Sequence, residues 1–84
     1  MSYTVRYLPE AEQELAALWM DSNKRDSITK AAHRIDRQLQ QAPEQLGESR
    51  PQDCRIHFEA PLAVLFRVLV SSQLVEVVHI WEFD

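Results

Sequence analysis

The stretch CRIHFEAPLAVLFRVLVSSQLVEVVHIWEF, residues 54–83, contains three strand patterns separated by two short turns. Residues 54–59 alternate between apolar and polar side chains, residues 62–70 are apolar at nearly every position, and residues 73–83 are rich in valine. Alternation is typical of a strand with one exposed face, and an apolar strand on both faces is typical of a central strand. The sequence therefore predicts a three-stranded meander, with its turns at Ala60-Pro61 and Ser71-Ser72.

The side chains of each strand pattern are expected to divide between two faces of the sheet. We expect the first strand to turn its apolar set to the core and its polar set to solvent; the polar set is Arg55, His57 and Glu59, and the apolar set is Cys54, Ile56 and Phe58. In the second strand Arg67 faces away from Val64 and Phe66. In the third strand a strict alternation places His79 and Trp81 on the same face as the valines at positions 75 and 77, where His79 is expected to be a core histidine.

Two helices are predicted upstream of the meander, after a first strand at residues 2–7. The first helix begins at Pro9 and extends to about Asp21, with an apolar stripe formed by Ala11, Leu15, Leu18 and Trp19. The second helix is expected to be capped by Asp26 or Ser27 and to end before Pro43; its stripe is Ile28, Ala31, Ile35 and Leu39. Trp19 is expected to lie in the core.

The order strand, helix, helix, strand, strand, strand predicts an α+β two-layer fold. The helical hairpin would pack on one face of a mainly antiparallel four-stranded sheet, because that face is the only large apolar surface available to it. Residues 43–53 are expected to form a loop that exposes Arg50, and the outer face of the sheet would carry Arg55, His57, Glu59 and Arg67. The chain is expected to be a single domain over residues 1–84.

Length and composition restrict the class of protein. Eighty-four residues with a formal net charge of −4 argue against nucleic-acid binding by overall electrostatics, although a local basic patch is compatible with that charge. A domain of this size is marginally stable alone, so a partner or a homodimer is expected. A signal peptide and a transmembrane segment are not expected, and the single Cys54 fits a reducing cytoplasm.

The basic residues of the meander suggest one type of chemistry. Arg55 and His57 lie two positions apart, and Arg67 on the next strand is expected to approach them. Arginine stabilises the charge that develops on a phosphate, and histidine serves as a general acid or base, so the three are candidate catalytic residues for phosphodiester cleavage. The alternative is ordinary surface pairing, with Arg55 bonded to Glu59 or Glu76. No ligand spacing for a metal or a cofactor is found, and Cys54 is expected to be a structural thiol.

Three segments together resemble the RelE/ParE superfamily of toxins from bacterial type II toxin–antitoxin systems. They are YTVRYLPEAEQELAAL at the start, RIDRQLQQAPEQLGESR in the middle, and CRIHFEAPLAVLFRVLVSSQLVEVVHIW at the end. The resemblance implies a cytoplasmic toxin, in a class that includes plasmid-stabilisation systems, which a cognate antitoxin neutralises by wrapping around it. It further implies one of two targets: messenger RNA in the ribosome, as for RelE-like mRNA interferases, or DNA gyrase, as for ParE-like members.

Only part of the pattern of the RelE-like nucleases is present. Arg55 and His57 occupy the places of two basic residues in the corresponding strand, and Arg50 is a candidate for substrate binding. Ala63 stands where those nucleases carry an arginine, so Arg67 would have to substitute for it. The ending WEFD brings Glu82 and Asp84 where a further arginine and often a tyrosine are found. Two functions therefore remain open: a toxin that cleaves messenger RNA, and a non-enzymatic binding module, either a gyrase poison or a degenerate toxin.

Overall fold

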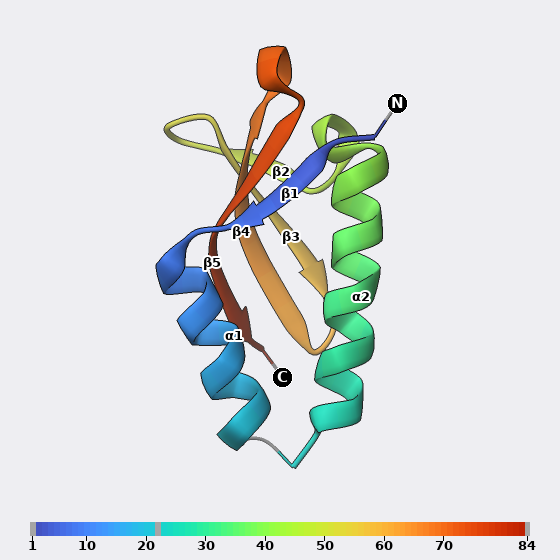
Figure 1. The fold of residues 1–84 in the computed structure, drawn as a ribbon, viewed down its shortest axis with the longest axis vertical. Helices are drawn as coiled ribbons and strands as arrows, with labels where there is room; N and C mark the ends of the chain where they lie inside the picture. Colours follow the sequence, from blue (N-terminus) through green and yellow to red (C-terminus); the bar gives the residue numbers. More distant parts are fainter. Residues whose placement is uncertain (1, 22, 84) are drawn as a thin grey trace.

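The computed structural model describes residues 2–21 and 23–83. A first strand leads into two antiparallel helices, and four further strands and two short 3-10 turns follow (Figure 1). The elements are β1 (Thr4–Tyr7), α1 (Pro9–Asp21), α2 (Arg25–Gln41), η1 (Pro43–Gln45), β2 (Glu48–Arg50), β3 (Cys54–Glu59), β4 (Leu62–Leu69), η2 (Val70–Ser72) and β5 (Leu74–Glu82). The predicted α+β fold with a helical hairpin on a sheet is confirmed.

The sheet has five strands, in the order β1-β5-β4-β3-β2. Strand β1 pairs parallel to β5, and every other neighbouring pair is antiparallel. The prediction of four strands missed one. Glu48–Arg50 lies in the segment expected to be a loop, and it pairs with β3. All three of its residues are exposed, so this short edge strand carries no apolar alternation that could have revealed it.

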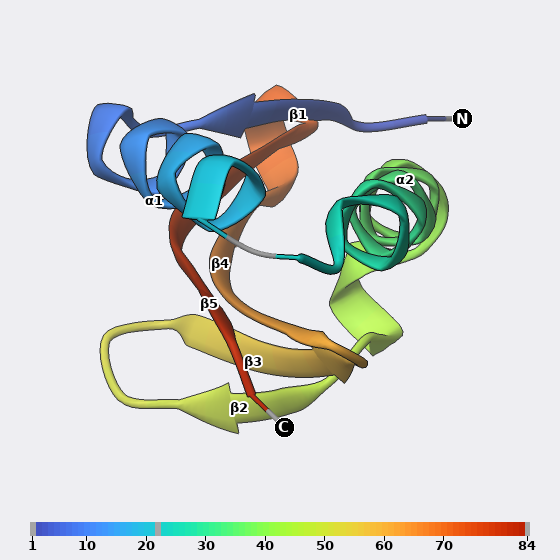
Figure 2. The same cartoon turned by 90° about the horizontal axis from the view of Figure 1, so that it is seen from below.

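The core lies between the helices and one face of the sheet. Helix α2 contributes Ile28, Ala31, Ile35 and Leu39, all buried, which confirms the predicted stripe. The sheet contributes Leu62, Val64, Phe66, Val75, Val77 and Ile80. Helix α1 adds the buried Ala11 and packs Leu15 and Leu18 against this cluster. In the end-on view α1 lies beside β5, and α2 lies opposite the curved part of the sheet (Figure 2).

A β-bulge in β5 changes which of its side chains face the core. Leu65 is paired with His79 and Phe66 with Val77, so Val78 has no partner on β4. The extra residue shifts the alternation by one position, and Ile80 enters the core together with Val77. The expectation that His79 and Trp81 share the face of Val75 and Val77 is therefore wrong.

Two local expectations about the helices were also wrong. Trp19 is 46% exposed rather than in the core. Helix α2 begins at Arg25 after Lys24, which makes no capping side-chain hydrogen bond, so Asp26 and Ser27 lie within the first turn. Pro43 does follow the end of α2, as predicted, and begins the η1 turn. No helix within the described residues is long and apolar enough to cross a membrane.

We expect Gly47→Ala to destabilise the fold by more than about 1 kcal/mol, because Gly47 has φ +72 and an added Cβ would overlap the carbonyl oxygen of Ile56. Thermal unfolding followed by circular dichroism measures this effect. The matched control is Gln45→Ala in the same turn, where the side chain is exposed, and it is expected to leave the melting temperature nearly unchanged. Equal melting temperatures for the two variants would contradict the prediction.

Candidate functional site

The side chains of β3 do not face as expected. In antiparallel strands, residues that stand opposite one another share a face. On β4, Phe66 stands opposite Arg55, Val64 opposite His57, and Leu62 opposite Glu59. The three β4 residues are buried in the core. The polar set of β3 therefore lies on the helix side of the sheet. The apolar set lies on the other side, where Phe58 is 50% exposed and contacts the ring of Phe83.

Arg55 is used to hold the segment before β2. Its Nε donates to the carbonyl oxygen of Leu46 at 2.8 Å, and its Nη2 donates to that of Gly47 at 3.0 Å. Its Nη1 donates to Ser49 Oγ at 3.0 Å. Because all three nitrogens bind the chain itself, the guanidinium has a structural task, and it pairs with neither Glu59 nor Glu76 as the alternative had supposed.

His57 belongs to a polar network between β3 and α2. Its Nε2 lies 3.1 Å from Gln38 Oε1 and 3.5 Å from Glu59 Oε1. Gln38 Nε2 donates to Glu59 Oε1 at 3.1 Å, and Arg34 Nε donates to Glu59 Oε2 at 2.8 Å. The network satisfies the polar side chains that the strand register turns toward the helix. It joins His57 to a carboxylate and, through that carboxylate, to a guanidinium.

The charge of Glu59 is stabilised by this network. Partial burial disfavours the ionised carboxylate, but the hydrogen bonds from Arg34, Gln38 and His57 outweigh it. The pKa of Glu59 consequently lies below its ordinary value. A carboxylate that stays ionised serves as an acceptor for its neighbours, and it fixes the position of the Arg34 side chain on α2.

Arg67 lies on the opposite face of the sheet from Arg55 and His57. It stands opposite Cys54 on β3, one position out of step with them. Its Nη2 donates to Glu76 Oε1 at 2.8 Å, and Arg6 of β1 donates to the other oxygen of Glu76. The two guanidinium groups lower the pKa of Glu76, and Glu76 raises the pKa of Arg67. The expectation that Arg67 approaches Arg55 and His57 is wrong for this reason of register.

Arg50 lies at the edge of the sheet, on β2, and is exposed as predicted. Its Nη1 donates to the carbonyl oxygen of Ser49 at 2.9 Å and lies 3.5 Å from Glu48 Oε1. With Arg55 it lines a hollow of about 320 Å³. A contribution of Arg50 to substrate binding remains a prediction.

A feature that the sequence interpretation missed is an apolar groove between the two helices, with a volume of about 620 Å³. Its apolar lining is formed by Leu15, Ala16, Trp19 and Met20 of α1 and by Ile28 and Ala32 of α2. Met20 is 67% exposed. The pairs Leu15 with Trp19 and Ala16 with Met20, each four positions apart, make the apolar arc of α1 wider than the core requires. This wide apolar arc is the feature of the sequence that could have revealed the groove.

Polar contacts shape the ends of this groove. Trp19 Nε1 donates to Thr29 Oγ1 at 3.2 Å, and the guanidinium of Arg25 lies 4.9 Å from the centre of the Trp19 ring. Glu12 and Asp36 are the carboxylates among its lining residues. Tyr7 donates to Asp36 Oδ1 at 3.1 Å, and burial together with that carboxylate raises the pKa of Tyr7. The lining of the groove is therefore mainly apolar and includes two carboxylates.

His79 is not a core histidine, because the bulge turns it outward, and 42% of its side chain is exposed. Its Nδ1 lies 3.1 Å from Glu14 Oε2, and Glu14 Oε1 accepts a hydrogen bond from the backbone N–H of Ile80 at 3.0 Å. Helix α1 thus uses Glu14 to satisfy the edge of β5 beyond the end of β1. Among the residues described, no group of three or more His, Cys, Asp and Glu side chains is placed to hold a metal ion.

No protein-family model matches the sequence, and no curated protein matches it either. Solved structures do match the fold over 98% of the chain. The toxin–antitoxin complex RelBE2 from Mycobacterium tuberculosis contains a chain that matches with a TM-score of 0.81 and 16% identity, over 92% of that chain. This chain has a RelE-like fold. The chromosomal ParDE system of P. aeruginosa matches with a TM-score of 0.71 and 16% identity, over 97% of its chain. A free E. coli RelE mutant matches with a TM-score of 0.72 and 14% identity, over 84% of its chain.

Positions where the chain departs from the RelE-like nuclease pattern can be placed on the RelE/ParE fold. Ala63 is fully buried, between Phe58 and Trp81 on neighbouring strands, and it offers no charge. Glu82 is exposed at the end of β5, and Asp84 lies outside the described residues. The structure brings Arg55, His57 and Glu59 to one face and does not add a further arginine from β4 to them.

We expect Glu59→Gln to lower the melting temperature at pH 7. The pKa of Glu59 lies below its ordinary value of 4.5 in the folded chain, so its ionised form stabilises the fold above that pH. This contribution is lost as the pH falls through the lowered pKa, and the difference between variant and wild type should shrink as the pH is taken below 4.5. Thermal unfolding over this range measures it. Glu48→Gln, an exposed residue in a loose pair, is the control and should show little change. A difference for Glu59→Gln that does not depend on pH would contradict the assignment.

Proposed function

We propose that this chain is the toxin of a type II toxin–antitoxin system, and that a cognate antitoxin inhibits it. Two of the solved structures with the same fold are toxin–antitoxin complexes, RelBE2 and ParDE, and the likeness covers nearly the whole chain. The observation that carries the proposal is the groove between α1 and α2, where Trp19 and Met20 expose apolar surface. An exposed apolar groove of this kind is a site for a partner.

The antitoxin segment proposed for this groove is an amphipathic helix. A helix laid along α1 and α2 would bury apolar side chains against Trp19 and Met20, in the helix-in-groove mode of recognition. The carboxylates of Glu12 and Asp36 favour lysine or arginine at the sides of that helix. A small domain of this type also gains stability from a partner that binds only its folded state.

We expect Met20→Glu to weaken antitoxin binding by about tenfold or more, because it places a charge where an apolar contact of about 1.5–3 kcal/mol is buried. Isothermal calorimetry with the protein encoded by the neighbouring small gene measures the affinity. Val70→Glu is the matched control, since Val70 is 55% exposed at the other end of the molecule. Unchanged affinity in Met20→Glu, or an equal loss in both variants, would contradict a site in the groove.

We propose further that the toxin acts by binding its target rather than by cleaving RNA. Of the three candidate catalytic side chains, Arg55 is bonded to three acceptors of its own chain and Arg67 is on the other face. His57 is left with Gln38 and Glu59. Cleavage of a phosphodiester is assisted by a cation that can turn toward the phosphate beside the acid or base. Arg55 is held in place by its three bonds, and Arg34 reaches the His57 network only through the carboxylate of Glu59. This arrangement supports the binding-module alternative, for which DNA gyrase is one candidate target.

We expect induced expression of the chain to produce no new 5′ ends inside translated codons of messenger RNA. We also expect His57→Gln to slow growth as much as the wild type does, because the histidine serves the contact with α2. Mapping of 5′ ends and growth curves measure both effects, and Arg37→Gln, an exposed residue of α2 outside the groove, is the control. New ends that disappear in His57→Gln and persist in Arg37→Gln would establish RNA cleavage and overturn this proposal.

A further inference from the structure

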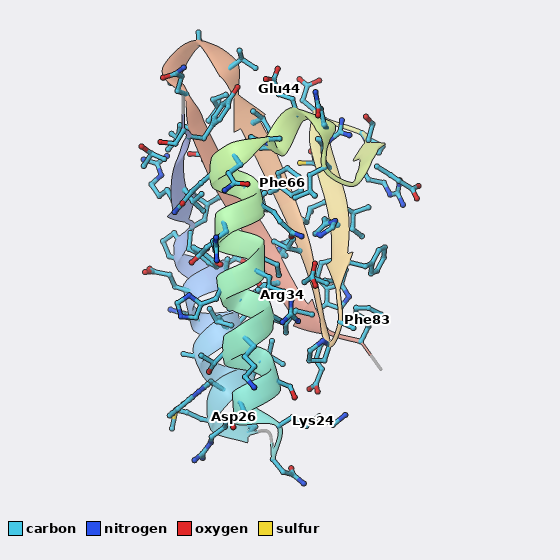
Figure 3. The ribbon with its side chains drawn as sticks, turned by 90° about the vertical axis from the view of Figure 1, so that its right-hand side faces the viewer. Lys24, Asp26, Arg34, Glu44, Phe66 and Phe83 are labelled. Carbon is cyan, nitrogen blue, oxygen red and sulfur yellow. The ribbon has the colours of Figure 1, made fainter. Side chains whose placement is uncertain are left out.

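A second cleft, distinct from the groove, lies between the N-terminal half of α2 and the turn that joins β3 to β4. It has a volume of about 410 Å³ and is lined by Lys24, Ser27, Lys30, Arg34, Ala60 and Pro61. Three of these six residues are cationic, in a chain with a net charge of −4. In Figure 3, Lys24 lies at the lower end of α2 and Arg34 lies further up, beside the sheet. The cleft therefore collects positive charge against the overall balance of the protein.

The Arg34 side chain is held in place with donors to spare. Its Nε donates to Glu59 Oε2 at 2.8 Å, and its Nη2 donates to the carbonyl oxygen of Ala60 at 3.3 Å. A guanidinium has five N–H donors. Within the described part of the chain these two bonds leave three of the donors available to another acceptor. Glu59 and Ala60 both belong to the β3–β4 end of the sheet, and they fix the guanidinium at the wall of the cleft. A donor group held in place in this way loses little conformational entropy when it binds a ligand.

Lys30 supplies a charge that the described chain does not neutralise. Within residues 2–21 and 23–83 no carboxylate forms an ion pair with it, and its side chain is exposed. It lies one turn before Arg34 on α2, so the two cations share one side of the helix. Arg34 already binds the carboxylate of Glu59. The lining residues of the cleft include no acidic side chain. Asp26, in the same part of α2, lines the neighbouring hollow.

The start of α2 adds to the same field. Lys24 stands at the N-cap of α2 and makes no capping side-chain hydrogen bond. The first backbone N–H groups of a helix have no partner within the helix itself. The N-terminal end of a helix carries a partial positive charge, which adds to that of the lysines. Ser27, in this first turn, places a hydroxyl in the cleft. The helix end, the hydroxyl and the three cations together suit a tetrahedral oxyanion with several acceptor oxygens.

We propose that this cleft binds a phosphate group, with Lys30 and Arg34 as its main cationic contacts. The phosphate is carried either by a small anion or by a single-stranded nucleic acid, and both sources offer the same chemistry to the cleft. The inference does not rest on the toxin assignment or on the antitoxin groove. Arg34 also belongs to the network that holds His57, so a bound phosphate would lie next to that network without requiring His57 to act on it.

The test compares two variants with the same change in net charge. Lys30→Glu removes a cation from the cleft, whereas Arg37→Glu removes one about 10 Å further along α2, outside it. Pyrophosphate is titrated against the labelled full-length chain while its backbone amide NMR signals are followed, and a short fluorescent oligouridylate is titrated by anisotropy. Circular dichroism establishes that both variants are folded. Lys30→Glu is expected to weaken binding by about tenfold or more, and Arg37→Glu by less than about threefold.

The two probes distinguish the source of the phosphate. Shifts with pyrophosphate in residues 24–34 that Lys30→Glu abolishes would identify a small-anion site. Binding of the oligouridylate alone, with a salt slope that falls by about 0.7 in Lys30→Glu, would identify a nucleic-acid phosphate. Absence of binding by the wild type to either probe would overturn the proposal. Equal losses in Lys30→Glu and Arg37→Glu would also overturn it, because they would reflect the general field of α2 and not the cleft.

Discussion

The register of β3 against β4 is the constraint on which the candidate site depends. Val64 and Phe66 must be buried beneath α2, and the residues opposite them on β3 are His57 and Arg55. Polar side chains are thereby directed toward the helix layer, where an unpaired donor or acceptor would be costly. Gln38 of α2 binds His57, and the carbonyl oxygens before β2 bind Arg55. The arrangement of charges on this side of the molecule follows from that requirement.

The parts of the fold that could be predicted are those with strong apolar periodicity. All four stripe residues of α2 are buried, and the helix ends before Pro43, because a wide apolar face and a proline are unambiguous signals. The faces of β3 could not be predicted, since alternation shows that two sets exist without showing which one meets the helices. The polar set faces inward here because α2 supplies partners for it. The bulge at Val78 and the edge strand Glu48–Arg50 leave no mark in composition.

The candidate site was less predictable than the fold. Arg55, His57 and Arg67 are conspicuous polar residues of the meander, yet their predicted grouping depended on a register that the sequence does not contain. The structure instead brings together residues from different elements, such as Gln38 with Glu59 and Arg6 with Glu76. The two helices also differ in charge. Glu10, Glu12 and Asp21 make α1 acidic, while Lys30, Arg34 and Arg37 place cations along α2. The groove and the cleft lie on opposite sides of α2, and this arrangement of charged residues cannot be read from composition alone.

The pairing of β1 with β5 has a consequence for the order in which the chain folds. These two strands are about 70 positions apart, and Tyr3 and Leu8 at the ends of β1 are bonded respectively to α2 and to β5. During synthesis β1 emerges first, but its hydrogen-bonding partner emerges only after every other element has been made. The hairpin of helices and the β3–β4 pair consist of local contacts and form early, whereas closure of the sheet must await β5. On the ribosome the sheet therefore stays incomplete until β5 is free, while the helices can already have formed.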